Sequence, residues 1–125
     1  MIGKWIYNCT VLILSLLIVS GCASSQFPTG EYTRQLEGQQ ISIIFEDNGS
    51  FAILRSGRAM SEGTYSNDGN QLTWTSDSSC PAPNDETATY SWILNDQILT
   101  FSLVDEDICF SRLYMLEKLS YEKQP

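Results

Sequence analysis

Short runs of β-branched and aromatic residues, separated by turn-forming residues, repeat along the chain from residue 30 onward. Runs of this kind predict β-strands, and no segment in this part of the chain shows a convincing helical period. Apolar and polar positions alternate in most of them, as at Ile41, Ile43 and Phe45, so each strand is expected to bury one face. Eight runs fit this description: 30–37, 39–47, 50–56, 59–66, 70–76, 87–95, 97–104 and 107–116.

The connections between these runs are mostly short, which restricts how the strands can pair. Asn48-Gly49 is a strong hairpin signal, and other short turns also contain Gly, Asn or Asp. Consecutive strands joined in this way are antiparallel neighbours. Because closure removes the exposed edges of such a meander, we predict an all-β fold, an eight-stranded antiparallel up-and-down barrel. A two-sheet β-sandwich uses the same alternation and is the alternative.

The first residues of the chain follow a different pattern. An apolar run from Val11 to Val19 is too short to span a bilayer and has the length of a signal-peptide core. The run ends in the sequence "VSGC", which resembles the lipobox of bacterial lipoproteins. This resemblance implies that residues 1–21 are a lipoprotein signal peptide and that Cys22 carries the lipid. An ordinary secretory peptide, or a membrane anchor that contains Cys22, is the alternative.

The same resemblance predicts how the mature chain is organised and where it lies. Residues 22–29 are small and polar and are expected to be a lipidated tether. The barrel domain is expected over 30–119, with a C-terminal tail at 120–125. Attachment to the cell envelope follows from the acyl chains on Cys22. Ala23 resembles the default outer-membrane signal of bacteria with two membranes; with one membrane, the location is the outer face of the cell membrane.

The composition is acidic and narrows the range of partners. The full chain has a net charge of −8, and loss of Lys4 with the signal peptide leaves six basic against fifteen acidic residues, a net charge of −9. Such a surface repels nucleic acid and anionic headgroups. We therefore expect no nucleic-acid partner, and membrane attachment only through the lipid.

Two cysteines remain for the fold of a lipidated, mature chain. Cys9 leaves with the signal peptide and Cys22 is acylated, so Cys80 and Cys109 are the remaining pair. Outside the cytoplasm, two cysteines in a domain this small usually form a disulfide. Such a bond would stabilise the fold by about 3–4 kcal/mol. Two free thiols with a redox role are the alternative, but the pair lacks the Cys-x-x-Cys spacing typical of that chemistry.

Two short motifs carry a further resemblance. The first strand begins with Gly30-x-Tyr32, and Asp107-x-Cys109-x-x-Arg112 lies near the last strand. In this order of parts the chain resembles small bacterial lipocalin-like, or calycin-like, lipoproteins, in which an Arg of the final strand covers an aromatic residue at the start of the barrel. The resemblance implies that Arg112 stacks on Tyr32 and closes one barrel end. Alternatively, Arg112 reaches the lumen and pairs with a ligand carboxylate.

Catalytic and metal-binding patterns are weak. The chain has no histidine, and none of its serines lies in a nucleophile elbow. The acidic group Asp105, Glu106 and Asp107 lacks the glycine of a calcium loop and is expected to form solvated turns. We therefore expect no enzymatic activity, no metal and no cofactor.

Two functions from different classes remain. The first is a lipid-anchored extracytoplasmic barrel that binds a small apolar or amphipathic ligand. The alternative is a protein-binding envelope module, such as a lysozyme-inhibitor-like lipoprotein, whose acidic surface would attract a basic enzyme. A role as an envelope spacer is a third possibility. The residues expected to bind the small ligand are Phe45, Phe51, Trp74, Trp92, Phe101 and Arg112.

Overall fold

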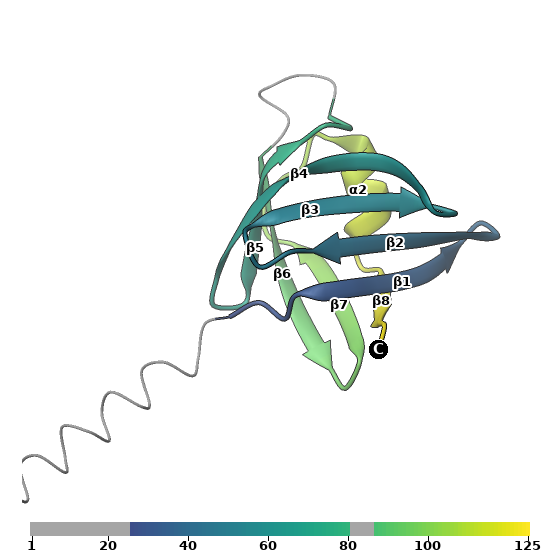
Figure 1. The fold of residues 1–125 in the computed structure, drawn as a ribbon. Helices are drawn as coiled ribbons and strands as arrows, with labels where there is room; N and C mark the ends of the chain where they lie inside the picture. The colour runs from purple at the N-terminus through teal and green to yellow at the C-terminus, as the bar shows by residue number, and fades with distance from the viewer. Residues whose placement is uncertain (1–25, 81–86) are drawn as a thin grey trace, which may run out of the picture.

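A computed structural model describes residues 26–80 and 87–125, which form a closed barrel of eight strands (Figure 1). The predicted signal peptide and the lipidation site Cys22 lie outside these residues. Seven strands lie within or close to the ranges expected from the sequence. These are β1 (Gly30–Leu36), β2 (Gln39–Phe45), β3 (Ser50–Arg55), β4 (Arg58–Asp68), β5 (Gln71–Asp77), β6 (Ala88–Asn95) and β7 (Ile98–Leu103).

Every strand pairs in antiparallel fashion with the next one along the chain, and the last strand returns to the first. The final strand, β8 (Ser120–Lys123), pairs with β7 and also with β1, where Tyr32 lies opposite Lys123. The up-and-down barrel predicted from the turns is therefore confirmed, and the β-sandwich alternative is wrong. Closure gives β1 and β8 partners on both sides.

The prediction for the last part of the chain needs correction. Residues 107–116 were expected to be the eighth strand, but Phe110–Leu116 is an α-helix, α2. The closing strand β8 lies inside the predicted tail, 120–125. The helix buries Arg112, Met115 and Leu116, a spacing of three and four residues that places them on one helical face. A short run of mixed apolar and polar residues fits the two-residue period of a strand as well as the 3.6-residue period of a helix. The helix forms because its buried face contacts the barrel.

The two ends of the barrel differ, and we name each by the element that covers it. The Phe27 end is where the chain enters β1, and it holds the β2–β3, β4–β5 and β6–β7 turns (Figure 1). The α2 end holds the β1–β2 and β3–β4 turns, the end of β5, the start of β6, and α2 itself. An up-and-down meander places alternate connections at opposite ends, so side chains at the two ends belong to separate surfaces.

One glycine permits the close approach of β4 and β5. A Cβ at Gly63 would lie 2.0 Å from the carbonyl oxygen of Ser76, on the neighbouring strand. The register between these two strands shifts directly afterwards, between Thr64 and Tyr65. Irregularities of this kind increase strand bending, which helps a small sheet to close.

Candidate functional site

The interior of the barrel is packed with aromatic side chains that contact one another and with aliphatic ones such as Ile43 and Leu72. Trp74 is completely buried, and its ring centroid lies 4.5 Å from that of Phe51 and 5.7 Å from that of Phe45. Phe101 is also buried, 6.4 Å from Trp74. Four of the residues predicted to bind a ligand thus pack against each other as the core. The fifth aromatic residue, Trp92, is only partly buried and lies toward the Phe27 end.

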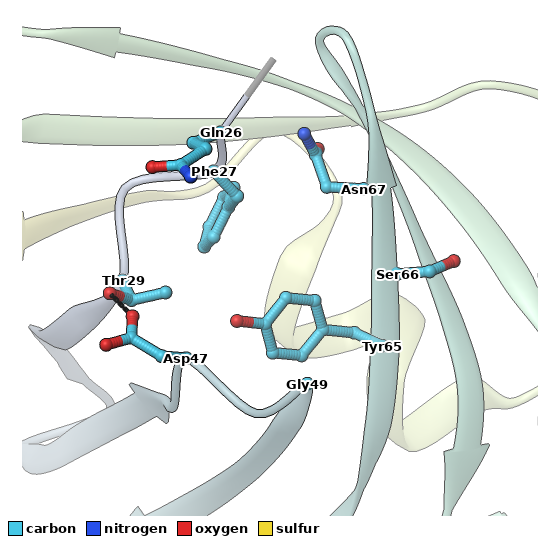
Figure 2. A pocket seen from close by; sticks show the side chains of 8 residues that line it. All are labelled: Gln26, Phe27, Thr29, Asp47, Gly49, Tyr65, Ser66 and Asn67. Atoms are coloured by element: carbon cyan, nitrogen blue, oxygen red, sulfur yellow. Dashed lines mark hydrogen bonds between the residues drawn. The ribbon is translucent and has the colours of Figure 1, made fainter. Parts of the chain in front are cut away.

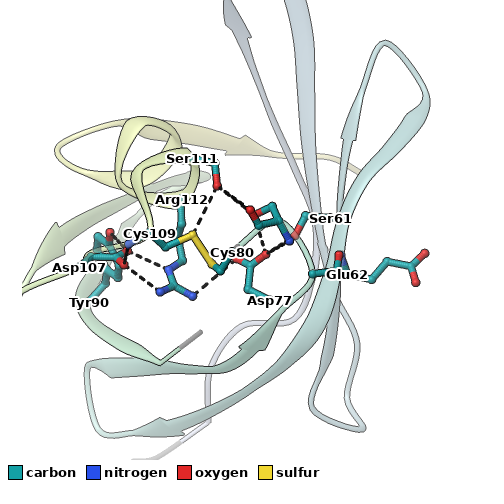
Figure 3. The surroundings of a disulfide bond; sticks show 11 residues. Ser61, Glu62, Asp77, Cys80, Tyr90, Asp107, Cys109, Ser111 and Arg112 are labelled. Atoms are coloured by element: carbon teal, nitrogen blue, oxygen red, sulfur yellow. Dashed lines mark hydrogen bonds and ion pairs between the residues drawn. A yellow bond between two sulfur atoms is a disulfide. The ribbon is translucent and has the colours of Figure 1, made fainter. Parts of the chain in front are cut away.

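The α2 end is closed by a buried ion pair rather than by stacked rings. Arg112 is 1% exposed, and its Nε and Nη2 each donate a hydrogen bond of 2.8 Å to the carboxylate of Asp107 (Figure 3). A second carboxylate, that of Asp77, lies 3.6 Å from Nη1. Tyr90 donates a further hydrogen bond of 2.6 Å to Asp107. Two internal carboxylates thus surround the guanidinium, which argues against a role as the partner of a ligand carboxylate.

This arrangement corrects the role expected for Arg112. Its predicted partner Tyr32 lies toward the Phe27 end, where the Tyr32 hydroxyl donates a hydrogen bond to the carbonyl oxygen of Pro28. A cation–π contact is instead made by Arg34, whose guanidinium carbon lies 5.7 Å from the ring centre of Tyr121. Arg112 does close one end of the barrel, but it does so from a helix and with carboxylate partners.

The ion pair keeps its charges because each partner stabilises the other. Burial opposes ionisation of Asp107, but hydrogen bonds from Arg112 and Tyr90 outweigh it, so the pKa of Asp107 lies below its usual value. Burial likewise opposes the charge of Arg112, and hydrogen bonding to Asp107 raises the Arg112 pKa above its usual value. Burial and the hydrogen bond to Asp107 also raise the pKa of Tyr90. Tyr90 therefore remains a neutral hydrogen-bond donor.

The disulfide predicted from the sequence is confirmed and lies beside this network. Cys80 and Cys109 are bonded, with their Cα atoms 5.4 Å apart. The bond joins the end of β5, which supplies Asp77, to the start of α2, which supplies Arg112 (Figure 3). The backbone N–H of Cys109 also donates a hydrogen bond to Asp107. The covalent link therefore holds together the two segments whose opposite charges meet.

The Phe27 end is closed by a residue that sequence analysis placed in the tether. Phe27 is 7% exposed, and its ring lies against Phe45, Tyr65 and Trp92 at centroid distances of 4.7, 5.8 and 5.1 Å. The hydroxyl of Thr29 donates a hydrogen bond of 2.6 Å to Asp47. The predicted tether, 22–29, is thus corrected, since its last residues pack on the barrel. The one available signal was a single aromatic residue among small polar ones.

A groove of about 460 Å³ opens beside this ring (Figure 2). Its walls combine the apolar Phe27 with polar groups of the β2–β3 turn and of β4, including Asp47 and Asn67. The Tyr65 hydroxyl donates a hydrogen bond to the Glu46 carbonyl oxygen, and Trp92 Nε1 donates one of 2.7 Å to Asn67. Burial is the main cause of the raised pKa of Tyr65, and the nearby carboxylates of Asp47 and Glu46 raise it further.

At the other end of the barrel, α2 and the segment between β7 and α2 carry exposed apolar side chains. We call the residues Val104, Ile108, Phe110 and Tyr114 the α2 surface. Phe110 is 81% exposed, and the other three are each about half exposed. The hydroxyl of Tyr114 donates a hydrogen bond of 2.6 Å to Glu37 in the β1–β2 turn. Since Phe110 and Tyr114 are four residues apart on α2, they lie on one face of it.

The described part of the chain, 26–80 and 87–125, contains no cluster of three or more residues able to hold a metal ion. Within the same residues, no helix has the length and apolar character needed to cross a membrane. The fold and its sites thus define a small, aromatic-filled, disulfide-linked antiparallel β-barrel. No family model matches the chain, and neither a curated protein nor a solved structure is significantly similar to it.

Proposed function

We propose that this protein is a lipid-anchored lipoprotein of the cell envelope whose barrel acts as a rigid protein-binding module. The observation that carries the proposal is the filled interior: Trp74 and its ring neighbours contact one another where a carrier would hold its ligand. An eight-stranded barrel is just wide enough for side chains to fill or for one small ligand. Phe27 and Arg112 additionally close its two ends, which leaves the outer surface as the place for recognition.

The position of the lipid sets the orientation in this proposal. Cys22 lies four residues before Gln26, and four residues of extended chain reach no more than about 14 Å. The Phe27 end therefore stands close to the membrane, whereas the α2 end points away from it and toward other envelope molecules. The same geometry makes the α2 surface the accessible one on an anchored protein.

The α2 surface has the features of a recognition site. Phe110 is a large, rigid ring that is 81% exposed, and aromatic residues of this kind are frequent anchors at protein interfaces. The net charge of −9 that the mature chain would carry attracts a basic partner over long range. We therefore expect the partner to be a basic extracytoplasmic protein, and a basic lysozyme is the first one to test.

The test compares two exposed apolar residues at different places on the barrel. Binding to a basic lysozyme is measured by biolayer interferometry for the unsubstituted protein, for Phe110→Ala, and for Ile93→Ala as the matched control. Ile93 is 67% exposed and lies on β6, outside the α2 surface. We expect Phe110→Ala to weaken binding at least about tenfold, Ile93→Ala to leave it unchanged, and higher salt to weaken it. Equal effects of the two substitutions would show that the α2 surface is not the binding surface. If the unsubstituted protein does not bind at all, a basic lysozyme is excluded as the partner.

The small-ligand hypothesis is less well supported, because its proposed residues contact each other. Native mass spectrometry of the purified protein separates the two ideas. A clean protein mass, reduced only by the two hydrogens of the Cys80–Cys109 bond, agrees with a protein-binding module. A stoichiometric apolar molecule without an amino group would instead favour the carrier. Lipidation is tested separately, by the loss of acyl-chain mass and of membrane association in Cys22→Ser.

A further inference from the structure

The ring of Phe27 occupies a site built by strands to which it does not belong. Phe45 comes from β2, Tyr65 from β4 and Trp92 from β6, and each meets the Phe27 ring edge to face at 65–88°. The first strand pair begins only at Gly30, opposite Phe45. Departure of Phe27 would therefore break no strand pairing and would leave an aromatic-lined mouth in a complete barrel.

Besides the packing of the Phe27 ring, two hydrogen bonds within the described residues hold this segment. The Pro28 carbonyl oxygen accepts a hydrogen bond from Tyr32, and the Thr29 hydroxyl donates one to Asp47. The second bond is exposed to solvent, where water competes for both partners. A tethered side chain that holds a pocket in this way behaves as an internal competitor at millimolar effective concentration.

The groove beside the ring adds a polar rim to the apolar mouth. Figure 2 shows the Phe27 ring directed toward Tyr65, with the Asp47 carboxylate on the other side of the opening. The carboxylate of Asp47 gives this rim a negative charge. At about 460 Å³, the groove has the size of a small-molecule site even while Phe27 is in place.

We propose that this mouth is a binding site for a small aromatic amine, and that Phe27 is a built-in occupant that such a ligand displaces. The aromatic ring of the ligand replaces that of Phe27 between Phe45, Tyr65 and Trp92. Its ammonium group lies in the groove and meets the carboxylate of Asp47, which releases Thr29. This site is at the opposite end of the barrel from the α2 surface, so the result of its test does not depend on the protein-binding proposal.

The test uses phenethylamine as the probe and isothermal titration calorimetry as the readout. The full chain carrying Cys22→Ser, secreted so that the Cys80–Cys109 disulfide forms, provides a lipid-free background. In this background, Phe27→Ala should bind phenethylamine at least tenfold more tightly than the chain with Phe27. Thr29→Ala, which loosens the segment but keeps the ring, should tighten binding severalfold. It also keeps the test decisive if Phe27→Ala fails to fold.

Two controls separate a specific site from a simple cavity. Phe51→Ala removes the same ring from the barrel interior, away from the groove, and should give no gain in binding. 3-Phenylpropanoate, with a carboxylate in place of the ammonium, should bind Phe27→Ala at least tenfold more weakly than phenethylamine, and Asp47→Asn should narrow that difference. The proposal is overturned if neither Phe27→Ala nor Thr29→Ala tightens binding, if Phe51→Ala gains equally, or if the two probes bind alike.

Discussion

Arg112 and Asp107 form a two-pronged ion pair that is completely buried at the α2 end of the barrel, with both hydrogen bonds at 2.8 Å. They are five residues apart in sequence, on the helix and on the loop that precedes it. The pair becomes part of the core only because α2 folds over the barrel, where Asp77 of β5 adds the second carboxylate. A cluster that looks like surface charge in the sequence is therefore an element of packing.

Removal of Arg112 should destabilise the fold strongly. The variant Arg112→Ala leaves Asp107 and Asp77 buried without their cation, and breaking a buried pair in this way costs about 3–5 kcal/mol. Urea unfolding of the oxidised protein measures the loss. The control is Arg58→Ala, an exposed arginine in β4, which should change the free energy of unfolding by less than about 0.5 kcal/mol. Similar small effects for both variants would show that the ion pair does not stabilise the fold.

Stability should depend on pH through Asp107. Its pKa is lower in the folded protein than in the unfolded chain, so its contribution is complete above the ordinary carboxyl pKa of about 4 and is lost as the pH falls through the folded value. Urea unfolding of the unsubstituted protein and of Asp107→Asn between pH 7 and pH 2 tests this. The difference between them should shrink in the acid range.

The matched control for this experiment is Asp96→Asn, which removes a carboxylate from the exposed β6–β7 turn. The positive φ of 57° at Asp96 is a conformation that Asn also tolerates, so the exchange leaves the turn intact. A constant difference between the unsubstituted protein and Asp107→Asn over the whole pH range would contradict the role given to Asp107.

The disulfide should stabilise the domain and also support the ion pair. Replacement of both Cys80 and Cys109 by Ser opens a link across 29 residues, and the expected loss is about 3–4 kcal/mol in guanidinium unfolding. Since Cys109 also bonds to Asp107 through its backbone, this loss should not add simply to that of Arg112→Ala. A double-mutant cycle measures the coupling, and full additivity would mean that the bond and the ion pair act independently.

Gly63→Ala should destabilise the barrel by steric overlap. A Cβ there would meet the Ser76 carbonyl at 2.0 Å, so β4 and β5 must separate, and overpacking of this kind costs about 1–3 kcal/mol. Gly38→Ala separates this effect from backbone strain, because Gly38 has a positive φ of 78° but nothing within 4 Å of the added Cβ. Thermal unfolding should show the larger loss for Gly63→Ala. A larger loss for Gly38→Ala would show that the positive φ, and not steric overlap, makes the glycine necessary.

Local patterns in the sequence were sufficient to predict most strands of the barrel and their order. Alternation over β2 and β7, and turn signals such as Asn48-Gly49, depend on neighbouring residues alone, so they predicted strands, antiparallel order and closure. The pairing of Cys80 with Cys109 followed from the small number of cysteines expected in the mature chain. Among the candidate site residues, the aromatic ones were found as a set, but their alternation could not distinguish a ligand-lined lumen from a packed core.

Tertiary structure alone decided the two barrel ends. The run from Asp107 to Leu116 fits a strand or a helix, and the helix forms because it buries Arg112, Met115 and Leu116 over the barrel. Strand β8 is only four residues long, too short for a distinct pattern, and it exists because β1 and β7 both present free edges to it. Phe27 has no periodic neighbours, and its burial depends on three rings from distant strands. Contacts between residues far apart in the chain have no local signature. The sequence therefore predicted strands β1–β7, whereas β8, α2 and the burial of Phe27 are visible only in the tertiary structure.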